Sequence, residues 1–217
     1  MTTASLTDPH AGQPIRATGT PLDEARVAVV MIHGRGASAE SILSLAPALD
    51  RERVAYLAPQ ASGGTWYPYG FMSPIERNEP GISSGMRAIE RVVAHVEAAG
   101  IPAERTLLLG FSQGGCLASE FVARHAHRWG GLAALSGGLI GPDGTPRDYP
   151  GSLDATPVFL GCSDVDPHIP EARVRESADV LARLGGQVTM RLYPGMGHLV
   201  NDDEIEEVRR MIDGALL

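Results

Sequence analysis

Short, unbroken apolar runs alternate along the chain with segments in which apolar residues recur every three to four positions. The unbroken runs lie at 26–32, 53–58, 105–111, 131–136, 157–161 and 188–193. The segments of helical period lie at 38–49, 83–99, 113–127, 171–184 and 202–216. A short continuous apolar run is typical of a strand buried on both faces. Strands that alternate with helices predict an α/β fold with a mainly parallel sheet and helices on both faces.

The ends of two predicted helices carry serines that can cap them. Ser38 precedes the first helical segment, and Ser83 or Ser84 stands at the start of the second. A serine hydroxyl at this position accepts a hydrogen bond from a free N–H of the first turn. We therefore expect Ser38 and one of the other two serines to begin these helices.

The domain organisation is predicted to be simple. Residues 1–22 are rich in Thr, Pro, Gly and Ala with little periodicity, which indicates an irregular N-terminal arm, with a short edge strand around 15–17. Residues 23–217 predict a single α/β domain, because the alternation continues to the end and no insertion is long enough for a large lid domain.

A long segment without periodicity, residues 59–81, separates the second strand from the second helix. It carries four aromatic residues: Trp66, Tyr67, Tyr69 and Phe71. Long loops without secondary structure of their own are often functional. We expect Trp66, Tyr67 and Phe71 to form a wall of a substrate pocket, the alternative being a loop that simply packs on the body.

The third apolar run ends in Gly110-Phe111-Ser112-Gln113-Gly114, which matches the pattern G-x-S-x-G between a strand and a helix. Such a turn strains the serine backbone and exposes its hydroxyl above the sheet. A side chain at Gly110 or Gly114 would collide with the neighbouring strand or helix. Ser112 also precedes a helix N-terminus, which favours negative charge. The pattern predicts that Ser112 is a nucleophile.

A serine nucleophile needs a base, and an acid that orients the base. With this turn the acid and then the histidine follow the serine in the chain. His198 fits, because it lies in a glycine-rich loop directly after the last predicted strand, at the sheet edge where such folds place their ligands. The acid should follow the strand at 157–161, and spacing alone does not separate Asp164 from Asp166. Five other histidines lie in the arm, in helices or in a different loop: His10, His33, His95, His125 and His127.

The negative oxygen formed during acyl transfer needs hydrogen-bond donors. We expect one from the backbone N–H of Gln113 and the other from that of Arg35, in the glycine loop after the first predicted strand. The Arg35 side chain could instead extend into the cleft and attract an acidic substrate group. His168 precedes a helix and is expected to be a pocket or surface residue.

Composition excludes several classes of protein. The net charge is −8, from 26 acidic and 18 basic residues, and no basic cluster is interleaved with aromatics, so nucleic acid is not expected as a partner. No apolar run approaches the ~18 residues of a membrane span, and neither a signal peptide nor a lipidation motif is expected. Cys116 and Cys162 are expected to be reduced core thiols. We therefore expect a cytoplasmic protein without membrane anchoring.

With these residues in place, the chain resembles the phospholipase/carboxylesterase family of α/β-hydrolases, which includes the acyl-protein thioesterases. The resemblance runs from about Val27 to the C-terminus and rests on four motifs in the family's order: His33-Gly34-x-Gly36, Gly110-Phe-Ser-Gln-Gly-Gly115, Asp164-x-Asp166-Pro-x-x-Pro170 and Gly197-His198. In the family the second aspartate of the third motif is catalytic, which implies that Asp166 is the acid. Arg35 departs from the apolar residue usual in the thioesterases.

The expected function is that of a serine hydrolase that cleaves carboxylic esters or thioesters of modest size through an acyl-enzyme. It would need no metal and no cofactor. Alternatives are a lysophospholipase, an acyl-protein thioesterase, a hydrolase in aromatic-compound degradation, or a noncatalytic binding protein with this fold. A homodimer formed through the aromatic loop is compatible with the sequence.

Overall fold

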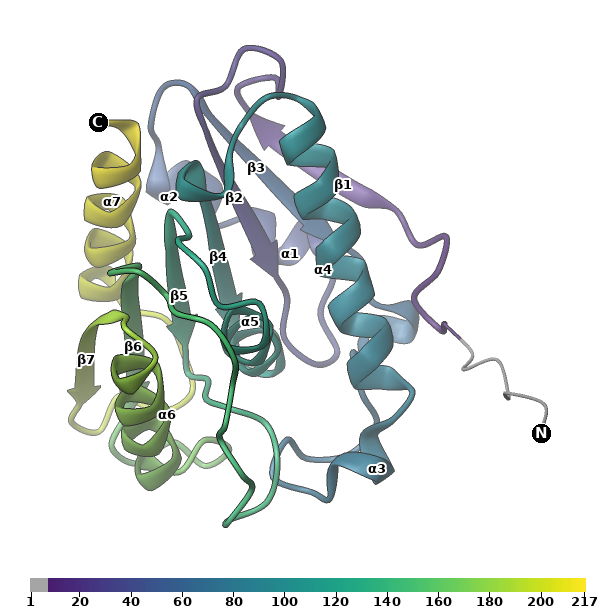
Figure 1. Ribbon diagram of the computed structural model, residues 1–217, viewed down its shortest axis with the longest axis vertical. Helices are drawn as coiled ribbons and strands as arrows, with labels where there is room; N and C mark the ends of the chain where they lie inside the picture. Colours follow the sequence, from purple (N-terminus) through teal and green to yellow (C-terminus); the bar gives the residue numbers. More distant parts are fainter. Residues whose placement is uncertain (1–7) are drawn as a thin grey trace.

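The apolar runs of the sequence form the strands of a single sheet in the computed structural model, which describes residues 8–217. Figure 1 shows the sheet at the centre of the molecule with helices around it. The strands are β1 (Ile15–Gly19), β2 (Val27–Ile32), β3 (Val54–Pro59), β4 (Thr106–Phe111), β5 (Gly131–Leu135), β6 (Pro157–Ser163) and β7 (Gln187–Tyr193).

The strand order is β1-β3-β2-β4-β5-β6-β7. Within the described residues, only β1 runs antiparallel to its neighbour, and the other five pairings are parallel. The predicted, mainly parallel sheet is therefore confirmed. β4 occupies the middle, so the residues that follow it lie between the loops that leave β2 on one side and β5 and β6 on the other. The expected edge strand at 15–17 is β1, whereas the domain boundary expected near residue 22 stays a prediction.

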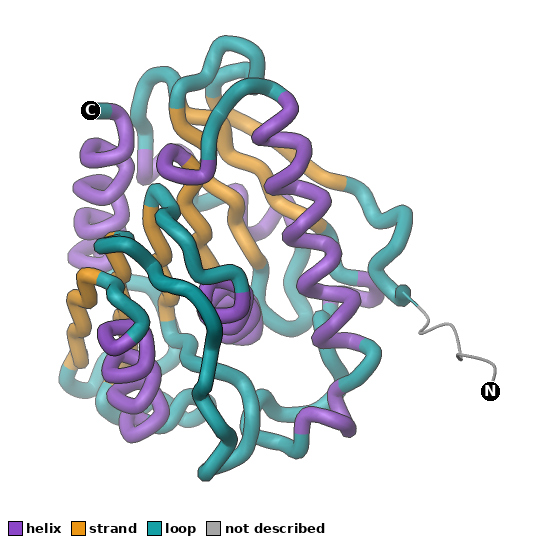
Figure 2. The backbone as a smooth tube through the Cα atoms, viewed as in Figure 1, coloured by secondary structure: helices purple, strands orange, loops and turns teal. Residues whose placement is uncertain are grey.

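Helices cover both faces of the sheet (Figure 2). They are α1 (Ala39–Leu43), α2 (Ala46–Leu49), α3 (Ile75–Asn78), α4 (Gly81–Ala98), α5 (Gln113–Arg124), α6 (Glu171–Arg183) and α7 (Asp202–Leu216), with short 3-10 turns η1 (Ser62–Gly64) and η2 (Ala103–Arg105). One core lies under α4, α5 and α6, and a second lies under α1, α2 and α7.

Alternate residues of each central strand supply the two cores. Along β2, Ala28, Val30 and Ile32 face the first core. Val27 and Val29 belong to the second. All of these are fully buried. Because burying a side chain of this size contributes ~1.5–3 kcal/mol, a strand apolar on both faces is stable only between two helix layers.

The helix expected at 38–49 is two helices, so that prediction was wrong in its length. Ser38 does cap the first, since its hydroxyl accepts a hydrogen bond from the N–H of Ser41. The break follows from Pro47, which has no N–H to donate to the carbonyl of Leu43 and would clash with it in a continuous helix.

The start of α4 also differs from the expectation. The helix begins at Gly81, directly after Pro80, so both serines lie inside its first turn. Proline suits this place because its φ is preset and it has no N–H to satisfy. The capping acceptor is the carboxylate of Glu79, which accepts from the N–H and the hydroxyl of Ser83. Ser84 instead donates its hydroxyl to Asp8.

The aromatic loop, residues 59–81, was expected to have no secondary structure and in fact contains η1 and the short helix α3. It runs along the end of the sheet at which the parallel strands terminate, the lower end in Figure 1. No inserted lid domain interrupts the chain between residues 8 and 217.

Candidate active site

Ser112 occupies a sharp turn between β4 and α5. Its backbone has φ 55° and ψ −121°, a strained conformation for a residue with a side chain. A Cβ on Gly110 would lie 2.2 Å from the carbonyl oxygen of Gly114, and one on Gly114 would lie 2.1 Å from that of Ile32. The steric reason given for these two glycines is therefore confirmed, since any side chain there would force backbone apart.

A chain of two hydrogen bonds joins Ser112, His198 and Asp166. Nε2 of His198 lies 2.8 Å from Oγ of Ser112, and its Nδ1 lies 2.7 Å from Oδ2 of Asp166. Because a carboxylate only accepts, the proton belongs on Nδ1, which leaves Nε2 free to accept from the serine hydroxyl. The three side chains follow β4, β6 and β7, so the topology brings together residues up to 86 positions apart.

Asp166 is held as a buried carboxylate. Its side chain is inaccessible to solvent, and Oδ1 accepts from the backbone N–H groups of His168 (2.8 Å) and Ile169 (3.0 Å). Burial alone would raise the pKa of Asp166. The hydrogen bonds from His198 and from the two N–H groups outweigh it, so the pKa lies below its ordinary value.

Asp164, the alternative acid, has a different contact. Its Oδ1 accepts from the backbone N–H of Gly195 at 2.8 Å. The hydroxyl of Ser163 similarly accepts from Gly197 at 3.1 Å. Both contacts fasten the end of β6 to the loop that carries His198. The geometry thus separates two aspartates that spacing left equivalent.

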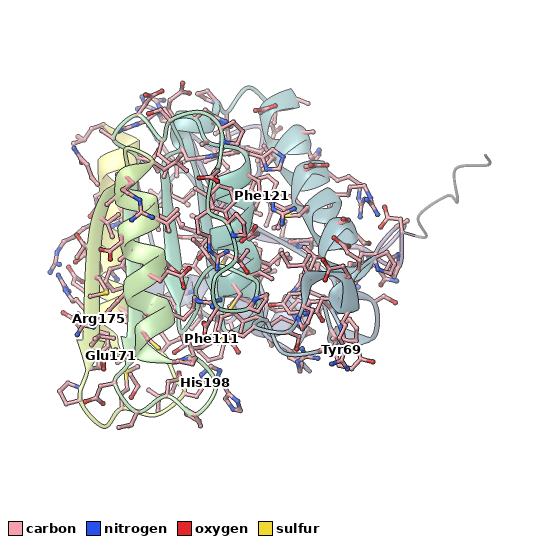
Figure 3. The ribbon with its side chains drawn as sticks, turned by 60° about the horizontal axis from the view of Figure 1, so that its bottom comes forward. Tyr69, Phe111, Phe121, Glu171, Arg175 and His198 are labelled. Carbon is pink, nitrogen blue, oxygen red and sulfur yellow. The ribbon has the colours of Figure 1, made fainter. Side chains whose placement is uncertain are left out.

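Two aromatic rings flank His198. The ring of Phe111 lies 4.9 Å from the imidazole, centroid to centroid, and His168 meets it edge-on at 4.8 Å. Figure 3, which brings this end of the molecule forward, shows Phe111 and His198 next to each other and Tyr69 farther along the same end. These contacts limit the orientations that the imidazole can take.

The backbone N–H groups of Arg35 and Gln113 are free of hydrogen bonds within residues 8–217. The one on Gln113 is at the first position of α5, where the helix dipole also favours negative charge. The Arg35 guanidinium donates to the carbonyls of Pro68 (2.9 Å) and Tyr69 (2.6 Å). The side chain therefore braces the aromatic loop, and these bonds account for its placement without an acidic substrate group.

The side chain of Gln113 makes a clamp that the sequence did not predict. Its Oε1 accepts from the N–H of Trp66 at 2.9 Å, and its Nε2 donates to the carbonyl of Tyr67 at 2.8 Å. One amide thus satisfies both backbone groups and ties the aromatic loop to the residue after Ser112. The only signal in the sequence was the glutamine itself within the Gly110–Gly115 motif.

A cavity of about 380 Å³ opens beside Ser112. Of the residues predicted for the pocket, Tyr67, Phe71 and His168 line it, together with Cys116. Apolar walls with a few polar groups at one end are the usual composition of a small-molecule site.

Trp66 does not line this cavity, so that part of the pocket prediction was wrong. The side chain is fully buried, and its indole N–H donates to the carbonyl of His33 at 2.8 Å. Its ring packs between His10 (5.2 Å) and His33 (5.0 Å). A large aromatic side chain with one donor is most stable where the ring is buried and the N–H is paired, which this position behind the loop provides.

The family model described as phospholipase/carboxylesterase matches residues 14–216. The chain belongs to this family. It is 42% identical to a phospholipase/carboxylesterase of Dyadobacter fermentans, with a TM-score of 0.89 over 93% of this chain and 96% of that one. The α/β-hydrolase fold expected from the resemblance is therefore confirmed.

Curated relatives agree with this assignment. An acyl-protein thioesterase 1 of Gibberella zeae is 32% identical over 66% of this chain, and the match spans 63% of that protein's length. A probable carboxylesterase of Oryza sativa is 27% identical over 96% of this chain and 86% of its own. The family member described here is a serine hydrolase that acts on carboxylic esters or thioesters.

Neither cysteine is part of a disulfide, as expected. Burial raises the pKa of both Cys116 and Cys162 to about 12, so both remain thiols at neutral pH. Within residues 8–217 no group of three or more His, Cys, Asp or Glu side chains could hold a metal ion. In the same range no helix has the length and apolar character needed to cross a bilayer.

Proposed function

We propose that Ser112, His198 and Asp166 are the catalytic triad of this hydrolase. Oγ of Ser112 attacks the ester carbonyl carbon while its proton passes to Nε2 of His198. The tetrahedral intermediate then expels the alcohol, which takes that proton from His198. Water, deprotonated by the same nitrogen, attacks the acyl-enzyme and releases the acid. What supports this is the hydrogen-bonded series Ser112–His198–Asp166, with spacings of 2.8 and 2.7 Å.

The oxyanion of the intermediate is proposed to bind the N–H groups of Arg35 and Gln113. In support, both lie at the cavity that contains Ser112 and neither is used in another hydrogen bond of residues 8–217. The Arg35 loop lies close to the nucleophile, because a Cβ built on Gly34 would be in contact with Cβ of Ser112 at 3.4 Å. The second donor is the backbone N–H of Gln113, and the two hydrogen bonds of the Gln113 side chain hold this residue in place.

The acyl group is proposed to occupy the cavity lined by Tyr67, Phe71 and His168. Its volume of about 380 Å³ is near the lower end of the ~300–1,000 Å³ typical of ligand pockets. The guanidinium of Arg173 lies over the ring of Phe71, 5.8 Å from its centroid. The size favours short and medium acyl chains over long ones.

The first test is hydrolysis of p-nitrophenyl esters of increasing acyl length, together with labelling by a fluorophosphonate probe. We expect kcat/KM to peak at a short or medium chain. The Ser112→Ala variant should lose labelling and at least ~10³-fold in kcat. A folded wild-type protein that neither labels nor turns over would contradict the mechanism and favour a noncatalytic binding role.

Thioester hydrolysis is the second candidate activity, favoured by the acyl-protein thioesterases among the relatives. The same acyl chain presented as an oxygen ester and as a thioester separates the two. A thioester kcat/KM more than about tenfold higher would assign the enzyme to thioesters.

Two further expectations stay predictions. One is a cytoplasmic enzyme that acts on small-molecule esters. The other is a homodimer formed through the aromatic loop, in which Tyr69 is the aromatic side chain most open to solvent, at 46%. Sedimentation of the wild type and of Tyr69→Ser checks the dimer, which the variant should weaken.

A further inference from the structure

A second cavity, of about 390 Å³, also borders His198. We call it the α1 groove, because Ile42 of α1 lines it, together with Leu45, Leu199 and Val200. The two cavities adjoin, because they share four lining residues: Gly34, Ala37, Phe111 and His198. Nothing in the proposed acyl path uses the α1 groove.

The polar side chains of the α1 groove are already paired within the protein. Nδ1 of His33 lies 2.8 Å from the carbonyl of Gly34, and its Nε2 accepts from the N–H of Ala61 at 3.1 Å. The hydroxyl of Ser41 donates to the carbonyl of Ser38 at 2.7 Å. Among residues 8–217, no Asp, Glu, Lys or Arg lines the groove. It therefore offers a ligand apolar contact and no charge, whereas the acyl cavity includes Arg35.

Leu199 gives a second indication that something apolar binds here. This residue is 48% exposed although it directly follows His198 and lines the groove together with Ile42 and Leu45. An exposed leucine next to other apolar side chains, in a concave surface beside reacting atoms, is typical of a ligand-binding groove.

The position of the groove identifies which part of the substrate it takes. The acyl cavity contains Ser112 together with Arg35 and Gln113, the proposed oxyanion donors. The α1 groove contains His198 but none of those three. In the tetrahedral intermediate the oxyanion points to the donors, and the leaving oxygen must point to Nε2 of His198 to receive its proton. With the acyl chain in the acyl cavity, the α1 groove is the other cavity at His198 that can take the group on that oxygen.

We propose that the α1 groove is the leaving-group subsite and that it binds an uncharged alkyl or aryl alcohol, or the corresponding thiol. This inference rests on the proposed triad. It disfavours substrates whose leaving group carries a charge, such as the headgroup of a lysophospholipid, because an ion in the groove would lose its hydration and find no partner.

The test holds the acyl group fixed as butyryl and varies the alcohol: methyl, butyl, hexyl, benzyl and choline. We expect kcat/KM of the hexyl ester to exceed that of the methyl ester by about tenfold or more, because each buried methylene contributes to binding. The choline ester should be at least about tenfold poorer than the hexyl ester. A flat series from methyl to hexyl would overturn the proposal.

A second measurement follows the acyl-enzyme directly. When p-nitrophenyl butyrate is hydrolysed with methanol or hexanol present, the added alcohol competes with water for the acyl group. If the α1 groove binds the alcohol, hexanol at equal concentration gives several times more butyrate ester than methanol. Equal yields would contradict the proposal.

The variants Leu199→Gln and Leu45→Gln make the groove polar while changing exposed or half-buried side chains. Both should lower the hexyl-to-methyl ratio of kcat/KM toward one and leave the acyl-length optimum where it is. Ile15→Gln, an exposed aliphatic residue on β1 at the far edge of the sheet, is the matched control. Variants that shift the acyl optimum instead would show that the α1 groove holds the acyl chain.

These outcomes are distinct from failure of the proposed function. A wild type that neither hydrolyses any ester of the series nor labels with a fluorophosphonate would contradict the proposed function itself. A wild type that labels and hydrolyses methyl butyrate but shows no preference among alcohols would agree with the proposed triad and contradict only the leaving-group subsite.

Discussion

At the scale of single residues, the site depends on close contacts and hydrogen bonds that other side chains at these positions would disrupt. Ser112 keeps a strained backbone because Gly110 and Gly114 allow strand, turn and helix to touch. Both carboxylate oxygens of Asp166 form hydrogen bonds, Oδ2 with His198 and Oδ1 with backbone N–H groups of its own loop. Single substitutions at such positions should separate stability from catalysis.

The first such pair compares the two aspartates. Asp166→Asn should reduce kcat by ~10³–10⁴-fold, because an amide that donates to Nδ1 stabilises the wrong tautomer of His198. Asp164→Asn should stay within about threefold of wild type, since its amide oxygen can still accept from Gly195. Steady-state kinetics on one p-nitrophenyl ester measures both. A larger loss in Asp164→Asn than in Asp166→Asn would reverse the assignment.

The second pair compares two glycines. Gly114→Ala should lower the free energy of unfolding by more than about 3 kcal/mol, because its Cβ would lie 2.1 Å from the carbonyl oxygen of Ile32. Gly214→Ala in α7 is the control: apart from its chain neighbours and the nearby backbone of its own helix, no atom of residues 8–217 lies within 4 Å of the new Cβ. It should leave stability unchanged or raise it by about 0.5–1 kcal/mol. Urea denaturation measures both, and equal stability of the two variants would contradict the steric argument.

At the scale of elements, the N-terminus of α7 fixes the loop that carries His198. Asn201 and Glu204 form a reciprocal capping box, each side chain accepting from the other's backbone N–H at 2.9 Å. Glu204 is fully buried against Gly161 of β6, where its Oε1 has no hydrogen-bond partner among residues 8–217. Burial raises the pKa of Glu204 to about 7.

This pKa makes stability depend on pH in a defined direction. The folded state keeps a proton on Glu204 up to about pH 7, whereas the unfolded chain releases it near pH 4.5, so stability falls as pH rises between these values. Glu204→Gln keeps the cap and stays neutral. Relative to wild type it should therefore gain up to about 3 kcal/mol between pH 4.5 and 8.

Urea denaturation at pH 4.5 and at pH 8 measures this gain. Asp202→Asn, an exposed acid in the same first turn, is the control and should show little change in its difference from wild type. A constant difference between Glu204→Gln and wild type across this range would show that the buried carboxyl does not titrate as described.

At the scale of the whole molecule, segments far apart in the chain fasten the aromatic loop over the sheet. His10 is buried near the start of the described chain, with Nε2 2.9 Å from the carbonyl of Trp66 and Nδ1 accepting from the N–H of Ser62. Trp66 in turn contacts His33, next to the Arg35 loop. The N-terminal segment thus supports the site from behind.

His10→Ala should therefore lower the free energy of unfolding by about 2–3 kcal/mol, since the buried carbonyl of Trp66 and the half-buried N–H of Ser62 lose their partner. It should also raise KM, because the aromatic loop lines the acyl cavity. His95→Ala, an exposed histidine on α4, is the control and should change neither. Thermal denaturation and ester kinetics on both variants provide the measurement. A His10→Ala protein as stable as His95→Ala would contradict this supporting role.

Much of the molecule was determined by patterns that act over a few residues. Unbroken apolar runs specify strands buried on both faces, and helical period specifies the layers that cover them. The steric demands of Gly110 and Gly114 are local too, which is why the turn at Ser112 could be described in advance. Pro47 and Pro80 carry local signals that explain the break between α1 and α2 and the start of α4, and these were missed.

What the tertiary structure decided were contacts between distant segments. Asp164 and Asp166 are equivalent in spacing, and only packing of the β6 and β7 loops directs one to Gly195 and the other to His198. Trp66 has the residue type of a pocket wall but is buried where its ring and N–H find partners. The two cavities beside His198 likewise exist only once α1, the aromatic loop and the β7 loop meet. The sequence by itself determined the positions of most strands and helices and the steric limits at the Ser112 turn, because these depend only on residues that are neighbours along the chain. Which side chains contact one another, and which are buried, depends on how segments far apart in the chain pack together in one core.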